Sequence, residues 1–229
     1  MKLKNRNIQI ACDGGAATGK STGAKMIAKK YKLKFLSSGL LYRYASLLIL
    51  KNNPKDKINF LKKKFDKLDY QKIEKINLHS QEISAHTAVI AKVNKIRIIL
   101  KKFQINFSKK NKNCCIEGRD ISTKILPNSD LKFFFKCRLD TTALRRYKEL
   151  KKKNAKIKLK DVKKALRIRN ILDTKRKNSP LLQHRDSVVI NTGILDKSAM
   201  LAKMSKSIES VIKKKYGNWT RTRKYKPTT

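Results

Sequence analysis

A run of glycines followed by one lysine and one serine suits the binding of a nucleoside triphosphate. The run is Gly14-Gly15-Ala16-Ala17-Thr18-Gly19-Lys20-Ser21, which matches G-x-x-x-x-G-K-[ST]. Its glycines permit backbone torsions that point successive N–H groups at one phosphate, and a following helix would add the positive end of its dipole. Lys20 would reach the β- and γ-phosphates, and the Ser21 hydroxyl would ligate Mg²⁺. The residues predicted to bind ATP are Gly14, Gly15, Ala16, Ala17, Thr18, Gly19, Lys20, Ser21 and Thr22.

Two arginines follow apolar runs in a way that predicts a common site with this loop. Arg43 ends the segment SSGLLYR after the run 33–36, and Arg119 follows the run 114–117 in the sequence EGRD. In parallel α/β sheets, ligands bind beyond the carboxyl ends of the strands. Both arginines are therefore expected near the phosphates.

The elements that must position these residues alternate between strands and helices. Strands are expected at 7–13, 33–36, 114–117, 131–137 and 187–191, and helices at 20–31, 40–50, 89–107, 140–153, 160–177 and 196–214. Asp140 or Thr141 is the expected N-cap of the fourth of these helices. The alternation predicts an α/β fold with a parallel sheet of five strands flanked by helices. Residues 55–88 are the least patterned and are expected to form a small subdomain or insertion.

Taken together, these segments resemble the bacterial cytidylate kinases, members of the nucleoside monophosphate kinase group of P-loop kinases. The resemblance runs from about residue 8 to about residue 212. It depends on IACDGGAATGKST, SSGLLYR, CIEGRDISTKILP, RRYKEL, RNILDTKRKNSPL and VVINTGIL. It implies a P-loop kinase fold with an NMP-binding insertion and a helical lid. The implied reaction transfers the γ-phosphoryl group of ATP to CMP or dCMP, with Mg²⁺ as cofactor.

The resemblance also implies domain boundaries and roles for individual residues. The chain would be one kinase domain with a core at 7–51 and 89–215, an NMP-binding insertion at about 52–88, a lid at about 154–182 and a basic tail at 215–229. Lys20, Arg119, Arg169 and Arg176 would be catalytic. The residues implied to bind CMP are Ser38, Arg43, Arg97, Arg119, Asp120, Arg169, Asp173 and Arg176.

The implied pairing of Arg97 with Asp120 suits cytosine, whose amino group is a donor and whose O2 and N3 are acceptors. Uracil lacks that amino group and would leave a buried Asp120 without a partner, which is costly. Two departures from the family, Ser37 in place of an aspartate and Ala88 in place of a serine, leave the preference among CMP, dCMP and UMP open. A kinase for UMP or another small acceptor is therefore an alternative.

The charge balance raises a different alternative. The chain has 229 residues, with 59 Lys and Arg against 16 Asp and Glu, a net charge of +43. Such an excess is typical of nucleic-acid-binding proteins, so such a protein on a degenerate kinase core is a further hypothesis. The lysines are spread along the chain, however, and we expect most of them to cover solvated faces, with ATP and CMP or dCMP as the partners.

Location and redox state follow from other features of the sequence. No apolar stretch is long enough to span a membrane, and the N-terminal residues lack the features of a secretory signal. The four cysteines form no C-x-x-C pair, and none of the three histidines has the spacing of a zinc ligand. We therefore expect a cytoplasmic protein with reduced thiols, and a monomer.

Overall fold

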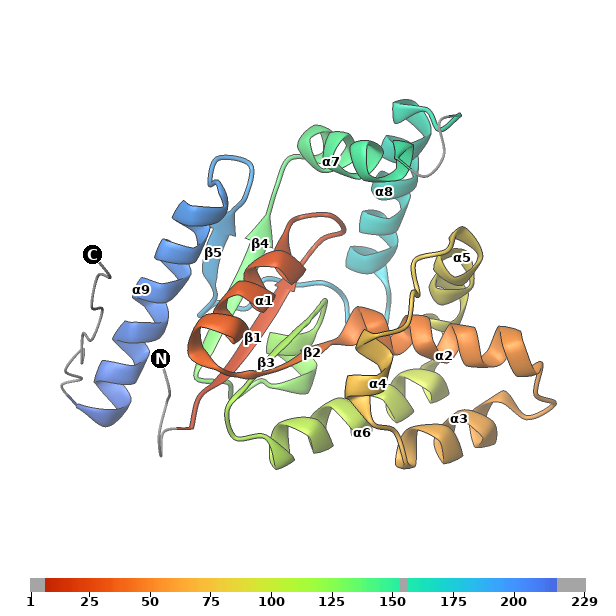
Figure 1. Cartoon of the computed structure of the whole chain (residues 1–229), viewed down its shortest axis with the longest axis horizontal. Coiled ribbons are helices and arrows are strands. Elements are labelled where there is room, and N and C mark those ends of the chain that lie inside the picture. The colour runs from red at the N-terminus through yellow and green to blue at the C-terminus, as the bar shows by residue number, and fades with distance from the viewer. Residues whose placement is uncertain (1–6, 153–155, 218–229) are drawn as a thin grey trace, which may run out of the picture.

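The expected strands form one five-stranded parallel sheet in the computed structural model, which describes residues 7–152 and 156–217 (Figure 1). The strand order is β2-β3-β1-β4-β5, so β1 lies at the centre between β3 and β4. Their bounds are β1 Gln9–Gly14, β2 Lys34–Ser37, β3 Cys114–Gly118, β4 Leu131–Lys136 and β5 Val188–Asn191. The predicted α/β fold and parallel sheet are confirmed.

The helices within the described residues flank this sheet and form the segments at its carboxyl edge. Their bounds are α1 Lys20–Tyr31, α2 Ser38–Asn52, α3 Lys57–Asp66, α4 Tyr70–Glu74, α5 Gln81–Ile90, α6 Asn94–Lys110, α7 Leu139–Lys151, α8 Leu159–Lys175 and α9 Lys197–Tyr216. None of them is long and apolar enough to cross a membrane. Residues 154–155 of the expected lid and 218–229 of the expected tail lie outside the described residues.

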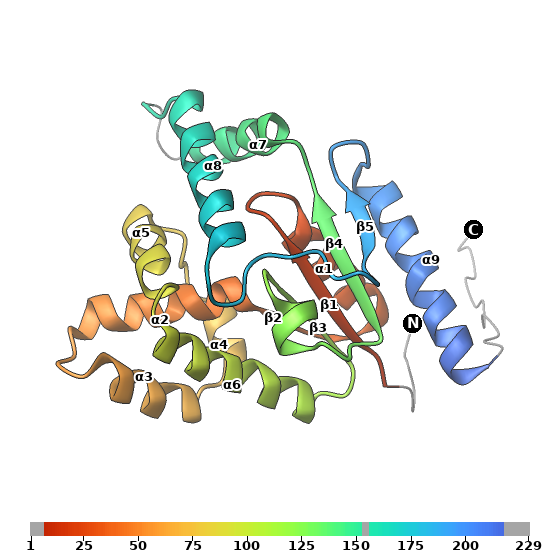
Figure 2. The ribbon, with the colours of Figure 1, turned by 180° about the vertical axis from the view of Figure 1, so that it is seen from behind.

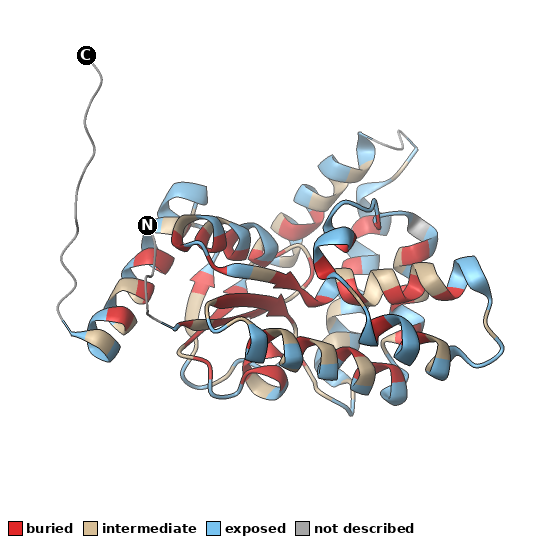
Figure 3. Ribbon diagram, turned by 60° about the horizontal axis from the view of Figure 1, so that its bottom comes forward, coloured by how far each residue is buried: buried red, intermediate tan, exposed pale blue. Residues whose placement is uncertain are grey.

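The two faces of the sheet carry separate apolar cores because side chains alternate along each strand. Ile10 and Cys12 of β1 pack with α1 and α9, and Ala11 packs with α2 and α6 on the opposite face. The two opposite views show these layers (Figures 1 and 2), and the strands are buried between them (Figure 3). A third, smaller cluster joins α7 and α8 to the phosphate loop through Ala16, Ala143 and Leu166.

Two sequence expectations about helices were wrong. The helix expected at 89–107 is interrupted: α5 ends at Ile90, and α6 begins at Asn94 after the extended residue Val93. Val89 and Val93 continue the apolar spacing of α6 across this break, so periodicity alone could not detect it. The expected N-cap at Asp140 or Thr141 is instead Arg138, which makes no side-chain capping bond.

Residues 55–88 contain α3, α4 and most of α5, and their apolar side chains join the core on the α2 and α6 face of the sheet. Leu61, Ile73 and Leu78 are fully buried there. Helix α3 begins at a regular cap, because Asp56 accepts the backbone N–H groups of Ile58 and Asn59. The segment is thus a set of short helices that share the main core.

Candidate active site

The phosphate-loop motif connects β1 to α1 at the carboxyl edge of the sheet (Figure 1). Gly19 caps α1 with φ 79°, a left-handed conformation that glycine adopts without strain. A Cβ added at Gly14 would lie 2.7 Å from the carbonyl oxygen of Phe135, so only glycine fits beside β4. The loop therefore has the backbone geometry that the motif predicts, and α1 follows it directly.

Lys20 is buried at the start of α1 and faces a carboxylate from β3. Its Nζ lies 3.4 Å from Oε2 of Glu117. Burial, together with the positive charges of Arg119 and Arg169, lowers the pKa of Lys20 to about 8, although Glu117 opposes the shift. Burial raises the pKa of Glu117, but Lys20 and the Ser37 hydroxyl outweigh it and hold that pKa below its ordinary value. Lys20 and Glu117 thus form a buried ion pair within the loop.

Several arginines gather near Lys20. Burial, together with the positive charges of Arg119, Arg43 and Arg146, lowers the pKa of Arg169 to about 10, although Asp173 opposes the shift. Arg119 is partly balanced, because its Nε donates to Oδ2 of Asp173 at 2.8 Å. A cluster of positive charges stabilises a bound polyanion, and phosphate groups carry the negative charge that such a cluster binds.

A second pair of opposite charges lies at the other end of the site. Arg97 on α6 donates to Oδ2 of Asp120 at 2.7 Å, and both side chains are buried. Nη2 of Arg176 lies 3.7 Å from Oδ1 of Asp120, and its Nη1 lies 3.6 Å from Asp173. A cavity of about 340 Å³ opens beside this pair, with Tyr42 in its wall. The pair presents both a donor and an acceptor to that cavity.

The backbone that carries Arg119 and Asp120 is held by a carboxylate from β1. Asp13 is fully buried and accepts the N–H of Ile121 at 2.8 Å and the N–H and hydroxyl of Ser122 at 2.7 and 2.6 Å. Burial raises the pKa of Asp13, although these hydrogen bonds oppose the shift. Residues Ile121–Ile125 form a short π-helical turn at this contact. Asp13 therefore ties the phosphate loop to the segment that follows β3.

The predicted lid contacts the phosphate loop directly. Oδ1 of Asn170 on α8 accepts the N–H of Ala16 at 3.2 Å. Gly15 permits this approach, because a Cβ there would lie 3.2 Å from the same oxygen. Helix α8 also carries Arg169 and Asp173, so one helix contributes to both the loop and the arginine cluster.

Two predicted residues on α2 lie at the margin of this network. Ser38 is buried against Gly118 of β3, where an added Cβ would lie 3.1 Å from the Cβ of Ser38. Arg43 donates to the carbonyl oxygen of Leu78 at 3.0 Å and to the hydroxyl of Ser84 at 2.8 Å. Arg43 is therefore held by the segment before α5 and by α5 itself, and burial, together with the nearby charges of Arg146 and Arg119, lowers its pKa.

The predicted catalytic residues and the predicted acids lie together. Ser21 and Thr22 are exposed at the start of α1, and the Ser21 hydroxyl is close enough to Glu117 to help lower its pKa. Sequence reasoning missed Glu117, Asp13 and Asn170. The first two are acids in apolar strands, an unusual placement that could have identified them. Asn170 carries no comparable signal, because its contact depends on where α8 packs.

Several known proteins are similar to this chain in sequence or in fold. The family model for cytidylate kinase matches residues 10–210. A cytidylate kinase of Fusobacterium nucleatum subsp. nucleatum is 34% identical over 227 residues, covering 90% of this chain and 99% of that protein. One from Clostridium botulinum (strain Loch Maree / Type A3) is 36% identical over 198 residues, covering 81% and 90%. An uncharacterized protein from Eubacterium ventriosum ATCC 27560 shares the fold, with a TM-score of 0.54 and 16% identity over 89% of this chain and 99% of that one.

Proposed function

Because this chain belongs to the cytidylate kinase family, we propose that its site transfers the γ-phosphoryl group of ATP to CMP and dCMP. An oxygen of the acceptor's phosphate attacks the γ-phosphorus, the bond from that phosphorus to the β-bridging oxygen breaks, and the products are ADP and CDP or dCDP. The observation that carries the proposal is the meeting of three features: the phosphate loop, the arginine cluster and the buried Arg97–Asp120 pair.

The donor nucleotide would bind at the loop. Its phosphates would accept hydrogen bonds from the N–H groups of residues 14–22 at the N-terminus of α1. The positive charge of Lys20 would attract the same phosphates. Phosphoryl transfer needs positioning and charge neutralisation more than covalent chemistry, and Lys20, Arg119, Arg169 and Arg176 would supply both. Arg169 and Arg176 would act from the lid, whose closure excludes water.

The acceptor would bind between the arginine cluster and the cavity beside Arg97. Asp120 would accept the cytosine amino group, and Arg97 would donate to the acceptor atoms of the ring. The remaining contacts to the acceptor's ribose and phosphate would come from Ser38, Arg43, Arg119, Arg169, Asp173 and Arg176. The divisions that accompany this proposal are a core at 7–51 and 89–215, an NMP-binding insertion at about 52–88 and a lid at about 154–182.

The residues near Lys20 fit Mg²⁺, which prefers oxygen ligands. The Ser21 hydroxyl contributes to the lowered pKa of Glu117, so the two side chains are close. Oε2 of Glu117 makes no hydrogen bond among the described residues and lies 3.4 Å from Nζ of Lys20. Ser21, with Glu117 beside it, would hold the ion, which when bound neutralises charge on the β- and γ-phosphates.

An ADP-release assay with CMP, dCMP, UMP and AMP tests this proposal. We expect turnover of CMP and dCMP that requires ATP and stops when EDTA removes Mg²⁺. Absence of turnover with every acceptor, in folded protein with Mg²⁺, would refute the proposal. Turnover of UMP above that of CMP would replace it with the alternative acceptor, which Ala88 on α5 leaves open.

The high net charge keeps nucleic-acid binding as a separate hypothesis. A phosphate-contact interface loses affinity steeply as salt rises, so titrating labelled RNA at two salt concentrations separates it from kinase activity. Tight RNA binding at physiological salt without CMP turnover would favour that hypothesis. A cytoplasmic location and a monomeric state stay predictions.

A further inference from the structure

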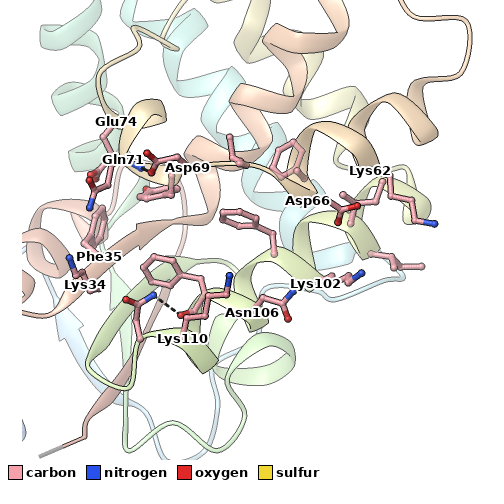
Figure 4. Close-up of a pocket in the computed structure, with 18 of the residues that line it drawn as sticks. Lys34, Phe35, Lys62, Asp66, Asp69, Gln71, Glu74, Lys102, Asn106 and Lys110 are labelled. Carbon is pink, nitrogen blue, oxygen red and sulfur yellow. Dashed lines mark hydrogen bonds between the residues drawn. The ribbon is translucent and has the colours of Figure 1, made fainter. Parts of the chain in front are cut away.

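A cavity of about 590 Å³ lies away from the proposed active site, between α3, α4, α6 and the start of β2 (Figure 4). Its lining includes the aromatic side chains of Phe35, Phe65, Tyr70, Phe103 and Phe107. The rings of Tyr70 and Phe107 meet edge to face, with their centroids 6.0 Å apart. Tyr70 thus forms part of the wall of a cavity that the proposed reaction does not use.

The hydroxyl of Tyr70 leads from this cavity toward the phosphate loop. It accepts the N–H of Ser37 at 2.7 Å, in a buried hydrogen bond between α4 and the end of β2. The hydroxyl of Ser37 in turn donates to Oε1 of Glu117, whose other oxygen lies 3.4 Å from Nζ of Lys20. Four residues from separate elements therefore form one continuous chain from Tyr70 to Lys20.

The directions of these hydrogen bonds are determined by chemistry. A carboxylate whose pKa is held low only accepts, so the Ser37 hydroxyl must donate to Glu117. The same Ser37 oxygen accepts the N–H of Leu40 at 3.3 Å, which caps α2. Ser37 is thereby held at its amide by Tyr70 and at its hydroxyl by Leu40 and Glu117.

Helix α4, which carries Tyr70, is short and depends on contacts with the rest of the protein to stay in place. It has five residues, of which Tyr70 and Ile73 are buried, and the cavity lies beside it. A helix this short is not stable in isolation. The hydrogen bond to Ser37 is therefore a specific link between α4 and the sheet.

We propose that Tyr70 is a positioning residue for phosphoryl transfer, acting through Ser37 and Glu117 to hold Lys20. The proposal rests on the proposed function. Tyr70 touches no reacting group; it holds the Ser37 amide, Ser37 orients Glu117, and Glu117 fixes the direction of Lys20. The transferring phosphoryl group gains most of its stabilisation from Lys20 in the transition state, so a loosened Lys20 lowers kcat more than substrate binding.

The test begins with Tyr70→Phe, which removes one oxygen and keeps the ring against Phe107. Removal of one hydrogen bond predicts a fall in kcat of about three- to tenfold. We expect KM for CMP to change by less than about twofold, since KM reflects binding shared by ground and transition states. Tyr44→Phe is the matched control: its ring packs on Phe65 in the same core, and its hydroxyl makes no hydrogen bond among the described residues. Its kcat should equal that of the unaltered protein.

A double-mutant cycle distinguishes positioning from general destabilisation. If Tyr70 acts through the Ser37 hydroxyl, Tyr70→Phe should have almost no further effect on kcat in a Ser37→Ala background. Ser37→Ala alone should lower kcat at least as much as Tyr70→Phe. Equal decreases from Tyr70→Phe in both backgrounds, or an unchanged kcat in the single variant, would overturn the proposal.

The outcomes also separate this proposal from the proposed function. If the unaltered protein does not turn over CMP or dCMP, the proposed function itself is refuted. If the protein is active and the effects of the two substitutions on kcat are additive, only the role of Tyr70 is refuted. Circular dichroism and thermal melting establish that each variant is folded at the assay temperature. If Tyr70→Phe does not fold, Ser37→Ala decides the question, because a kcat equal to that of the unaltered protein would refute the chain of contacts.

Discussion

Replacing Asp120 by alanine should remove most of the discrimination between CMP and UMP. The Asp120 carboxylate is buried and pairs with Arg97 at 2.7 Å beside the cavity of about 340 Å³. Alanine deletes the acceptor proposed for the cytosine amino group and leaves the buried Arg97 without its closest partner. UMP has no amino group to donate to Asp120, so its turnover should fall less.

The size of the effect follows from the strength of the hydrogen bond between Asp120 and the cytosine amino group. A hydrogen bond to a charged group contributes about 1.5–3 kcal/mol, and each 1.4 kcal/mol is a factor of about ten. The ratio of kcat/KM for CMP to that for UMP should therefore fall by about 10- to 150-fold. KM for ATP should change little, because the contacts of Asp120 are with Arg97 and Arg176 and not with the phosphate loop.

Steady-state kinetics with both acceptors, measured by ADP release, checks this prediction. Asp130→Ala is the control, because Asp130 also pairs with a cation, Lys215 at 2.6 Å, and accepts the N–H of Gln9. That pair lies at the start of β1, away from the carboxyl edge of the sheet. An unchanged ratio of CMP to UMP turnover in a folded Asp120→Ala variant would refute the assignment of Asp120 to the base.

Three further variants test the phosphate loop and its support. Lys20→Ala should lower kcat by at least about a hundredfold, measured by ADP release, because the transferring phosphates no longer meet a buried cation; near-normal turnover in folded protein would refute the loop assignment. Gly14→Ala should abolish ATP binding in calorimetry or prevent folding, since its Cβ would lie 2.7 Å from a carbonyl oxygen of Phe135; unaltered binding would contradict that packing. Asp13→Asn should lower the melting temperature, because an amide donor replaces one of the two oxygens that accept from Ile121 and Ser122; an unchanged melting temperature would count against it.

The lysines that give the chain its high positive charge are, among the described residues, nearly all at least partly exposed to solvent. Within residues 7–152 and 156–217, Lys20 and Lys132 are the lysines that are buried. Lys132 donates to the carbonyl oxygen of Ser129, so its burial is explained by the turn before β4. Lys20 faces Glu117 and the arginine cluster instead, and this buried position distinguishes it from the other lysines.

Some features follow from the sequence because they depend on neighbouring residues. The strand alternation, the glycine pattern before Lys20 and the spacing of Arg169, Asp173 and Arg176 are local, and the strands and α8 form close to the expected positions. Local periodicity also failed where it met a break: Val89 and Val93 continued an apolar repeat across the end of α5. A pattern of side chains does not report whether the backbone between them is continuous.

Contacts between segments far apart in the chain were decided only by the tertiary structure. Nothing in the sequence joins Asp13 to Ser122, Ala16 to Asn170, or Tyr70 to Ser37, because each contact depends on how the strands order and how the helices pack. The resemblance implied that Arg97 and Asp120 both contact cytosine, but the direct ion pair between them came only from the structure. Sequence thus determined which groups could bind nucleotides. The pairing of β1 with β3, the contact of α4 with the end of β2 and the contact of α8 with the phosphate loop decided which groups hold them in place.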